Sequence, residues 1–420
     1  MTSQIENNYP DLSCCRVCGL STLEVFLELG NLYQTGFFPL KDERVKRSAL
    51  NLSKCSNCGL VQLLNDSPIE ELYGSNYGYE SNLNSSMRAH LISTAKSLET
   101  KFNLTAGDAI LDIASNDGTF LSGYTPDLYE IVGIDPLIDH LNDFYPENTL
   151  KIKKFFSSTE VNKCIDRKFN LITSFSVFYD LNNPVQFSKD IENLLAPEGV
   201  WVLEQSYLPS MFQTLGFDTI CHEHLLYLTL SDLENITRRS GLKIFNVLIN
   251  DVNGGSFQVY VCRSTSKTHQ MNPYVQWLLN WEINSGITSL ENCIIFSENV
   301  KRFKKELRNL LSDFKQNGFS IFGLGASTKG NVLLQYCELS EFVATIGEIN
   351  PKKFGKVTPG SNIPIVNQKL LLETAEHDMS KSLGIILPWH FRNSITKSAE
   401  IYLEKKGSLL LPLPFPTVIN

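Results

Sequence analysis

Two pairs of cysteines near the start of the chain constrain its fold more than any other feature. Each pair has two residues between the cysteines and a glycine directly after the second one, at Cys15–Gly19 and Cys55–Gly59. This pattern forms a tight turn that directs two sulfurs at one metal ion, and two such turns predict a closed tetrahedral Zn²⁺ site. Since four sulfur ligands leave no open position, we expect the zinc to be structural. Its predicted ligands are Cys15, Cys18, Cys55 and Cys58.

The gap between the two pairs exceeds the commonest zinc-ribbon spacing, which predicts an inserted hairpin or loop between Cys18 and Cys55. Four unrelated buried thiols are a weaker interpretation, because both spacings match a metal site. A redox pair is also weaker, since no strand–helix–strand pattern surrounds either pair. Cys14 is a poorer ligand candidate than Cys15, because it breaks the two-residue spacing.

Length and charge exclude several classes of protein. A chain of 420 residues is too long for one ordinary core and predicts two or three domains. The formal net charge of -8 argues against a nucleic-acid-binding protein, which normally carries a basic patch. Residues 1–10 lack a basic start followed by an apolar run, so no signal peptide is predicted. No stretch approaches the roughly 20 apolar residues of a membrane helix. We therefore expect a cytoplasmic protein that binds neither nucleic acid nor membranes.

The middle of the chain alternates between strands and helices. After a polar, tyrosine-rich stretch at 66–86, which is typical of a linker or lid, apolar residues recur at helical spacing from Met87 to Phe102. A capping box at Ser231–Glu234 predicts a helix that ends at Gly241. The expected parallel strands are Ala109–Ile113, Ile131–Ile134, Leu150–Ile152, Leu171–Thr173 and Val200–Leu203.

A hairpin is expected to follow these five strands. Its arms are Ile244–Ile249 and Phe257–Cys262, and Asn253-Gly254-Gly255 forms the turn. Five parallel strands and a terminal hairpin predict a seven-stranded, doubly wound, Rossmann-like sheet.

A second α/β unit is expected beyond this sheet. An apolar stripe from Phe303 to Phe314 predicts a long helix that ends at Gly318. Its expected strands are Phe319–Phe322, Phe342–Ile346, Gly384–Leu387 and Ser408–Leu411. The predicted fold class is therefore α/β, with a zinc-binding domain at 1–75, a seven-stranded Rossmann-like domain at 76–265 and a C-terminal Rossmann-like domain at 266–420.

The turn after the first central strand is the expected cofactor site. Parallel α/β sheets bind ligands at the carboxyl ends of their strands, and Asp112 and Asp135 end two such strands 23 residues apart. The turn lacks a full Gly-x-Gly-x-x-Gly pattern. It therefore suits S-adenosylmethionine, which has no phosphates, better than a dinucleotide; a simple packing turn is the plainer alternative. The expected cofactor-binding residues are Asp112, Ala114, Asn116, Gly118, Asp135 and Pro136.

The densest group of reactive side chains is His222-Glu223-His224. On an extended segment the two histidines share one face and Glu223 points away. A metal site is possible, but the spacing is not that of the helical zinc motif. A structural hydrogen-bonding cluster and general base catalysis are the other interpretations. The position directly after the fifth strand favours catalysis.

The glycine-rich turn at Gly323–Gly330 allows a rival interpretation as an NAD site, with Glu348 as the acid at the next strand end. Its glycine spacing is not the dinucleotide fingerprint. Ser327, Thr328, Lys329 and Asn331 begin a predicted helix, where anions bind readily, so we favour the phosphates of a sugar nucleotide there. A packing turn is again the plainer alternative.

Over nearly its whole length the sequence resembles the sugar C-methyltransferases that make branched deoxysugars. The resemblance includes the cysteine pairs, Tyr73–Tyr79 with Met87 and His90, Ser115–Gly118, Asp218–Ile220 with His222–His224, and Asn253–Ser256. It continues through Gly325-Ala326, Lys329–Asn331, Asn350-Pro351, Pro359-Gly360, Ile363-Pro364 and Leu387–Trp389. It implies a zinc-binding domain, a methyltransferase domain, and a nucleotide-diphosphate keto sugar bound between that domain and the C-terminal one.

The resemblance also implies a reaction. His224 would remove a proton from the ring carbon beside the ketone, with Glu223 next to it, and the enolate carbon would take the methyl group of S-adenosylmethionine. No metal is needed for this step. Some relatives carry tyrosine in place of Cys221 and histidine in place of Asp180. The expected catalytic residues are His224, Glu223, His222, Tyr179 and Asp180, and the expected substrate-binding residues are Tyr79, Tyr227, Asn253, Lys329 and Asn331.

Two other functions stay open from the sequence. One is an NAD-dependent oxidoreductase or epimerase of nucleotide sugars, with a dinucleotide at Gly323. The other is a sugar-nucleotide-binding protein without catalysis. The bound cofactor separates the first of these from a methyltransferase, and tolerance of the loss of His224 identifies the second.

Overall fold

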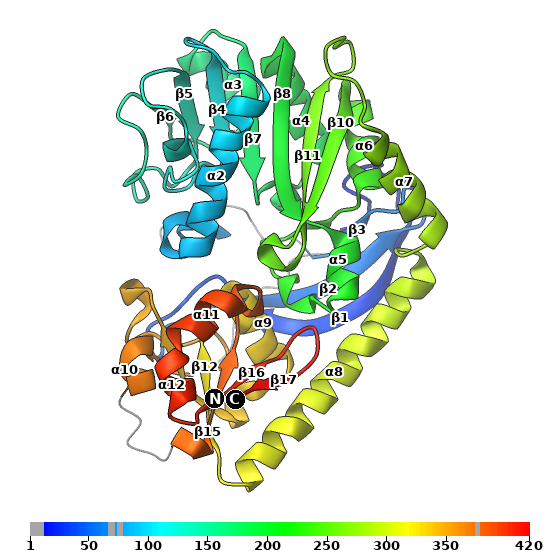
Figure 1. The fold of residues 1–420 in the computed structure, drawn as a ribbon. Helices are drawn as coiled ribbons and strands as arrows, with labels where there is room; N and C mark the ends of the chain where they lie inside the picture. Colours follow the sequence, from blue (N-terminus) through cyan, green and yellow to red (C-terminus); the bar gives the residue numbers. More distant parts are fainter. Residues whose placement is uncertain (1–11, 66–71, 74–78, 374–378) are drawn as a thin grey trace.

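The computed structural model describes residues 12–65, 72–73, 79–373 and 379–420 and contains three sheets (Figure 1). Part of the expected lid lies outside the described residues, namely 66–71 and 74–78, which include Tyr77. Within the described part of the chain, no helix is both long enough and apolar enough to cross a membrane.

The N-terminal sheet has four antiparallel strands in the order β1-β2-β3-β9. Its hairpin of β1 and β2 confirms the insertion expected between the cysteine pairs. The fourth strand comes from the middle of the chain and was not expected. The strands are β1 (Leu23–Tyr33), β2 (Arg47–Cys55), β3 (Val61–Leu63) and β9 (Leu226–Tyr227).

The central sheet confirms the seven predicted strands, in the order β10-β11-β8-β7-β4-β5-β6. Its first five strands in the sequence are parallel, and β11 pairs antiparallel with both β8 and β10. Every residue of Ala109–Ile113 is buried, as expected for a parallel strand covered on both faces. The strands are β4 (Ala109–Ile113), β5 (Glu130–Ile134), β6 (Leu150–Ile152), β7 (Phe169–Phe175), β8 (Leu195–Ser206), β10 (Leu242–Asn250) and β11 (Ser256–Arg263).

The helices of the central domain follow from their caps and apolar faces. Asn84 caps the predicted helix that begins before Met87, and its side chain accepts hydrogen bonds from two backbone amides. One expected cap is wrong: the capping box joins Thr229 and Asp232, not Ser231 and Glu234. The helices are α2 (Ser85–Lys101), α3 (Ser158–Cys164), α4 (Pro184–Leu194), α5 (Leu208–Gln213) and α6 (Leu230–Arg239).

The C-terminal sheet has six strands in the order β14-β13-β12-β15-β16-β17, and all are parallel except β17. This confirms the second α/β unit. The strands are β12 (Ser320–Leu324), β13 (Val343–Glu348), β14 (Ile365–Asn367), β15 (Ser382–Ile386), β16 (Ser408–Leu411) and β17 (Thr417–Ile419). The helices are α7 (Pro273–Ser285), α8 (Leu290–Gln316), α9 (Thr328–Tyr336), α10 (Gln368–Glu373), α11 (Arg392–Ser398) and α12 (Glu400–Glu404).

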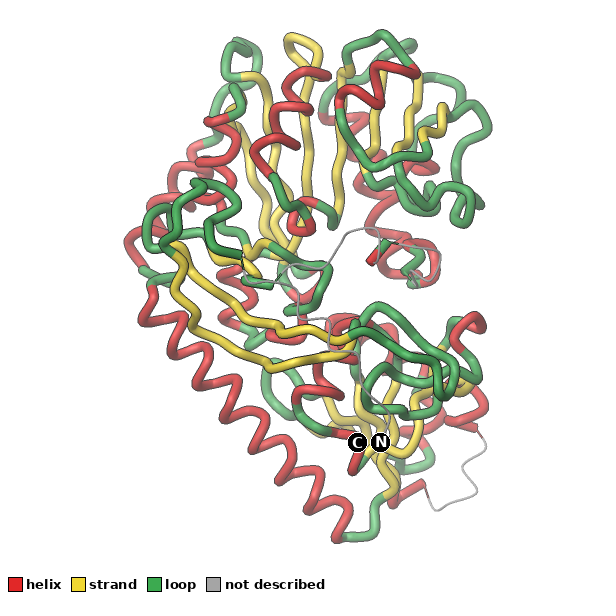
Figure 2. Tube along the Cα trace, turned by 180° about the vertical axis from the view of Figure 1, so that it is seen from behind, coloured by secondary structure: helices red, strands yellow, loops and turns green. Residues whose placement is uncertain are grey.

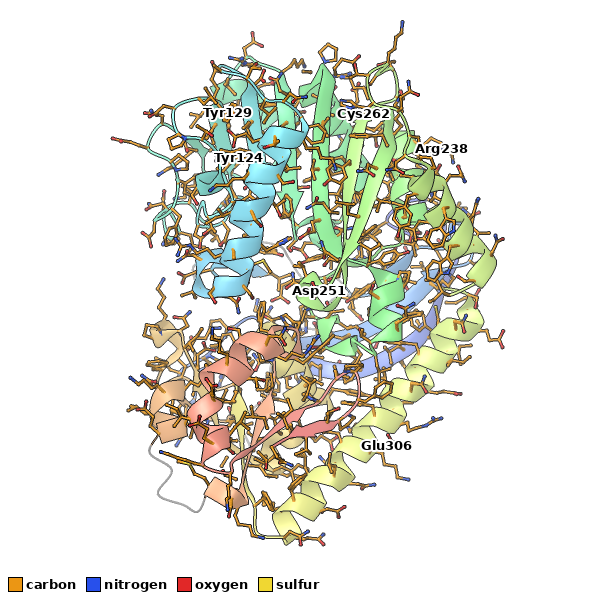
Figure 3. All side chains as sticks on the ribbon, viewed as in Figure 1. Tyr124, Tyr129, Arg238, Asp251, Cys262 and Glu306 are labelled. Atoms are coloured by element: carbon orange, nitrogen blue, oxygen red, sulfur yellow. The ribbon has the colours of Figure 1, made fainter. Side chains whose placement is uncertain are left out.

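The long helix α8 runs along one side of the molecule, from the central domain to the C-terminal domain (Figure 1). It buries Phe303, Leu307 and Leu311, and it ends at Gln316 with Asn317 as its C-cap before Gly318, where the sequence predicts the end. The β1–β2 hairpin crosses between the two α/β sheets, and the view from behind shows the same arrangement (Figure 2). Asp251, at the tip of the β10–β11 hairpin, lies on the side of the central sheet that faces the C-terminal domain (Figure 3).

Candidate active site and zinc centre

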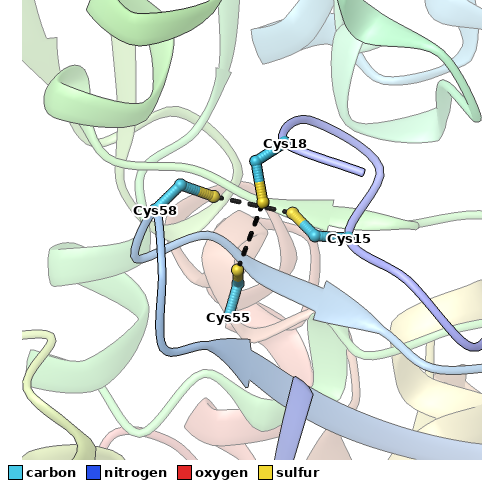
Figure 4. Close-up of side chains that lie close together, drawn as sticks. All are labelled: Cys15, Cys18, Cys55 and Cys58. Carbon is cyan, nitrogen blue, oxygen red and sulfur yellow. Dashed lines mark hydrogen bonds between the residues drawn. The ribbon is translucent and has the colours of Figure 1, made fainter. Parts of the chain in front are cut away.

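The four predicted zinc ligands lie together at the ends of β1, β2 and β3 (Figure 4). Their sulfurs all lie within 4.8 Å of one another. The sulfurs of Cys15 and Cys58 are 3.5 Å apart, and those of Cys18 and Cys55 are 3.6 Å apart. A tetrahedral Zn²⁺ with bonds of about 2.3 Å would place its sulfurs about 3.8 Å apart. The four side chains therefore fit a structural zinc ion.

A cavity of about 560 Å³ lies where the carboxyl ends of the central strands face the turn after β12. This volume is typical of a site for small ligands. The cavity brings together twelve of the residues predicted for cofactor, substrate and catalysis. These are Tyr79, Asp112, Ala114, Asn116, Asp135, Pro136, Tyr179, Asp180, Glu223, His224, Asn253 and Lys329.

The turn after β4 forms one end of the cavity. Its backbone is left-handed at Ala114 and Asn116, with φ of 56° and 50°, a conformation that side chains other than glycine rarely adopt. Asp135 stabilises this turn, since its carboxylate accepts hydrogen bonds from the amides of Asn116 (3.0 Å) and Leu137 (2.7 Å). Strained backbone of this kind is concentrated at ligand sites. Gly118 lies outside the cavity; its φ is 82°, and a Cβ there would lie 2.5 Å from the backbone nitrogen of Tyr145.

This end of the cavity is acidic. Burial raises the pKa of Asp112 to about 7 and the pKa of Asp135 to about 6, because a buried carboxylate loses hydration. A neighbouring acid contributes to each raised pKa, namely Asp135 to that of Asp112 and Asp117 to that of Asp135. A cationic ligand would relieve this repulsion. S-adenosylmethionine carries a positively charged sulfonium, so the residues present fit this cofactor.

His224 has a defined tautomer. Its Nδ1 lies 2.8 Å from the carbonyl oxygen of Thr219, and a carbonyl can only accept, so Nδ1 carries the hydrogen and donates. The lone pair of the neutral ring is therefore on Nε2. Burial, together with the nearby charge of Lys329, lowers the pKa of His224 to about 3. The ring packs against Tyr179 with centroids 4.2 Å apart. The side chain is thus held as a neutral imidazole at the cavity wall.

Two buried carboxyl groups lie at the same wall. Asp180 Oδ2 accepts a hydrogen bond from Tyr73 at 2.5 Å, and Oδ1 has no hydrogen-bond partner among the described residues. Glu223 Oε2 also lacks a partner within the described chain. Burial raises the pKa of Glu223 and places the pKa of Asp180 well above its ordinary value. Protonated carboxyl groups here can donate hydrogen bonds to a ligand oxygen.

The opposite end of the cavity belongs to the C-terminal domain and is basic. Lys329 Nζ donates to the carbonyl oxygen of Asn253 at 2.8 Å, which joins α9 to the β10–β11 hairpin. Asp218, buried beneath, accepts from Trp389 Nε1 at 2.9 Å. Ser327 caps α9 through the amide of Gly330 at 3.0 Å. A lysine beside a helix N-terminus suits an anion, such as a phosphate.

Three other predicted residues lie away from the cavity. Tyr227 lines a small adjoining pocket with Tyr179 and His224. Asn331 is buried and donates to the carbonyl oxygen of Thr35 at 2.7 Å, so it joins α9 to the N-terminal hairpin. His222 is buried beside the backbone of β1 and β2.

The expected arrangement of the histidine cluster is therefore wrong. Residues 221–224 form a turn, in which the amide of His224 donates to the carbonyl oxygen of Cys221 at 3.2 Å, instead of an extended segment. Glu223 and His224 both line the cavity, whereas His222 does not.

The sequence interpretation missed several residues of the cavity. His390 lines the basic end, and burial with Lys329 and Arg392 nearby lowers its pKa well below the ordinary value. Ser81 holds the acidic end, since its amide donates to Asn116 Oδ1 at 3.0 Å. The sequence could have indicated His390, because this residue directly follows the Leu387–Trp389 motif. No pattern of sequence marks Ser81.

Glu348 is already occupied by backbone groups. Its Oε2 accepts from the amide of Ala326 at 2.7 Å, and its Oε1 accepts from the amides of Ile349 (2.7 Å) and Asn350 (2.8 Å). The carboxylate therefore fixes the turn after β12, which weakens its candidacy as a ribose-binding acid in an NAD site.

Three family models match successive parts of the chain. A zinc binding domain matches residues 15–73, a methyltransferase domain matches residues 84–247, and a C-methyltransferase C-terminal domain matches residues 251–414. The C-methyltransferase NovU of Streptomyces niveus is 27% identical over 414 residues, which cover 97% of this chain and 96% of that protein.

Solved structures align with only part of the chain. An S-adenosylmethionine-dependent methyltransferase from Clostridium acetobutylicum is 12% identical and covers 41% of this chain and 91% of its own, with a TM-score of 0.31. The plantazolicin methyltransferase BpumL in complex with SAH is 14% identical and covers 44% of this chain and 88% of its own, with a TM-score of 0.34. TM-scores this low do not identify the function of this chain, which is inferred from the sequence matches alone. By those matches, this chain is an S-adenosylmethionine-dependent C-methyltransferase with an N-terminal zinc-binding domain.

Proposed function

We propose that this C-methyltransferase acts on a nucleotide-diphosphate keto sugar and methylates a ring carbon beside the ketone, in branched deoxysugar biosynthesis. The observation that carries the proposal is one cavity that is lined by His224, by the buried carboxyl groups of Asp112 and Asp135, and by Lys329. The acidic end suits the cationic cofactor, and the basic end suits a diphosphate. We also propose the domain boundaries 1–75, 76–265 and 266–420.

In the proposed reaction His224 is the base. Nε2, which carries the lone pair, takes the proton from the ring carbon beside the ketone. Thr219 holds the ring through Nδ1 and remains hydrogen-bonded when the imidazolium forms. S-adenosylmethionine would be held at the Asp135 end and would supply the methyl group to the ring carbon; its sulfur–methyl bond would break as the carbon–carbon bond forms, and neutral S-adenosylhomocysteine would leave.

Glu223 and Asp180 are the proposed partners of the developing enolate. Proton removal places negative charge on the ketone oxygen, and donors positioned at that oxygen lower the barrier. Both carboxyl groups are buried at the cavity wall and their pKa values are raised, so they can be present as neutral donors. Tyr179, which packs on the His224 ring, and Tyr79, at the cavity wall, complete the proposed catalytic and substrate-binding surfaces.

The substrate class is tested with labelled S-adenosylmethionine and a panel of nucleotide sugars with and without a ketone. We expect label on a carbon of a keto sugar only, and no transfer by His224→Ala. Transfer to a hydroxyl oxygen of a non-keto sugar would overturn the proposed reaction. A dinucleotide bound at Gly323, with hydride transfer, would support the oxidoreductase or epimerase instead.

A further inference from the structure

The segment that carries Glu223 and His224 leads directly into the zinc-binding sheet. Directly after His224, the amide of Leu63 donates to the carbonyl oxygen of Leu225 at 2.9 Å. Strand β9, Leu226–Tyr227, then pairs with β3 as the fourth strand of that sheet. β3 follows directly after the second cysteine pair, so the metal site lies at the start of the strand that holds β9.

The residue before Glu223 is also held by the zinc domain. The side chain of His222 is 1% exposed and lies beside the backbone of Leu32 and Ser48, which face each other in the β1–β2 ladder. Neither ring nitrogen makes a hydrogen bond of good geometry with a described residue. The ring therefore fills a space against the hairpin and touches no ligand in the cavity. The hairpin thus contacts the catalytic segment at a second point, before β9.

The tip of the same hairpin reaches the catalytic carboxyl group. A Cβ at Gly36 would overlap Oε1 of Glu223, and it would lie 3.7 Å from Thr328 Oγ1 at the start of α9. Only a residue without a side chain leaves Glu223 in this position. The φ of Gly36 is not in the left-handed region, so an alanine suits its backbone. The overlapping atom is the end of a flexible side chain, so a substitution moves the carboxyl group at little cost in stability.

The hairpin is in turn fixed on the C-terminal domain. Gln335 Oε1 accepts from the amide of Tyr33 at 2.7 Å, and Gln335 Nε2 donates to the Tyr33 carbonyl oxygen at 3.2 Å. Asn331, one helical turn earlier on α9, holds the carbonyl oxygen of Thr35. The hairpin tip therefore has one defined position relative to both α/β domains.

From these contacts we propose that the zinc-binding domain positions the catalytic segment, with Gly36 and His222 as positioning residues that act through Glu223 and His224. The inference rests on the proposed function of these two residues. It assigns the zinc ion a role in the geometry of catalysis as well as in the stability of its own domain.

The first test is a double-mutant cycle between Gly36→Ala and Glu223→Asp. Gly36→Ala should lower kcat at least tenfold, with unchanged affinity for S-adenosylmethionine and unchanged zinc content. Aspartate is shorter by one methylene group and makes room for the alanine, so Gly36→Ala should cost much less in the Glu223→Asp background. Gly216→Ala is the matched control, because the φ of Gly216 is -73° and the nearest atom to its Cβ would be Thr214 Oγ1 at 3.3 Å. An unchanged kcat in Gly36→Ala would overturn the inference.

The second test measures hydrogen exchange of the full chain before and after zinc removal by a chelator. It needs no enzymatic activity, so it remains informative even if Glu223→Asp is inactive. Exchange at residues 221–228 should increase at least tenfold, while exchange at residues 109–135 should not change. Unchanged exchange at 221–228 would contradict the positioning role. If His224→Ala keeps full activity, the proposed function fails. If His224→Ala is inactive but Gly36→Ala and the exchange pattern are normal, only the positioning role fails.

Discussion

At the scale of single residues, the sequence identified the base candidate but not its surroundings. Two histidines beside a glutamate, directly after a buried strand, were enough to single out His222–His224. Their directions could not be predicted, because they depend on a turn at Cys221 and on a hairpin nearly two hundred residues earlier in the sequence. Local periodicity carries no information on such a contact.

The burial of His222 predicts a pH dependence of stability. Burial lowers its pKa to about 4, although the adjacent backbone of Ser48 and Leu32 opposes the shift. The unfolded chain, with an ordinary value near 6.5, binds the proton more readily. The stability that the neutral ring contributes is therefore complete above pH 6.5 and is lost as the pH falls toward 4. From pH 7 to pH 5 the loss is about 2 kcal/mol.

The measurement is urea unfolding of the wild type, His222→Phe and His140→Phe at pH 7 and pH 5. His222→Phe should lose about 2 kcal/mol less than the wild type between the two pH values, and the exposed His140 serves as the control. Equal losses in the wild type and His222→Phe would show that the buried ring is not responsible.

At the scale of helices and strands, the elements were predicted correctly where their burial produces a periodic pattern of apolar residues in the sequence. All five parallel strands and the long helix α8 were found from their apolar residues. The start of α6 was misplaced because Ser231 and Thr229 match the capping pattern equally well. In the structure, Ser231 Oγ donates to Glu282 Oε2 at 2.6 Å, which leaves Thr229 as the cap. The two-residue strand β9 was missed because so short a strand has no periodicity.

The two cysteine pairs of the zinc site provide a prediction at the same scale. Cys55→Ser removes one sulfur, and metal binding to such a domain contributes directly to its folding. We expect loss of bound zinc and a Tm lower by roughly 10 °C, from a loss of about 3 kcal/mol. Cys14→Ser is the control, because Cys14 lies next to the site but is not one of the four grouped sulfurs. Zinc content and thermal unfolding are the measurements; a Cys55→Ser protein with full zinc content would contradict the predicted ligand set.

At the scale of the whole molecule, the site arises from two α/β units whose strand ends face one cavity. The sequence predicted both units. It also predicted that the cofactor binds to the first unit and the phosphates of the substrate to the second. It did not predict that the β1–β2 hairpin lies between them, or that His390 lines the cavity beside Lys329. Such facts depend on how the domains pack, which long-range contacts decide.

Because the cofactor and the nucleotide sugar are proposed to bind at different ends of the cavity, a substitution at one end should affect mainly one of the two ligands. Asp135→Asn should weaken S-adenosylmethionine binding about tenfold, which corresponds to about 1.4 kcal/mol, and leave the KM for the nucleotide sugar nearly unchanged. Lys329→Met should have the reverse effect, because its ammonium lies at the other end of the cavity. Calorimetry and steady-state kinetics measure the two ligands independently. Equal effects of both variants on both ligands would contradict the proposed division of the cavity.

The central claim is that His224 removes a proton from carbon. Its most direct measurement is the exchange of the ring proton beside the ketone with solvent deuterium, recorded by NMR with S-adenosylhomocysteine in place of the methyl donor. We expect the wild type to catalyse exchange at the carbon that is otherwise methylated, and His224→Ala to reduce its rate at least a thousandfold, roughly the contribution of a general base. Exchange at the wild-type rate in His224→Ala would contradict the assignment of His224 as the base.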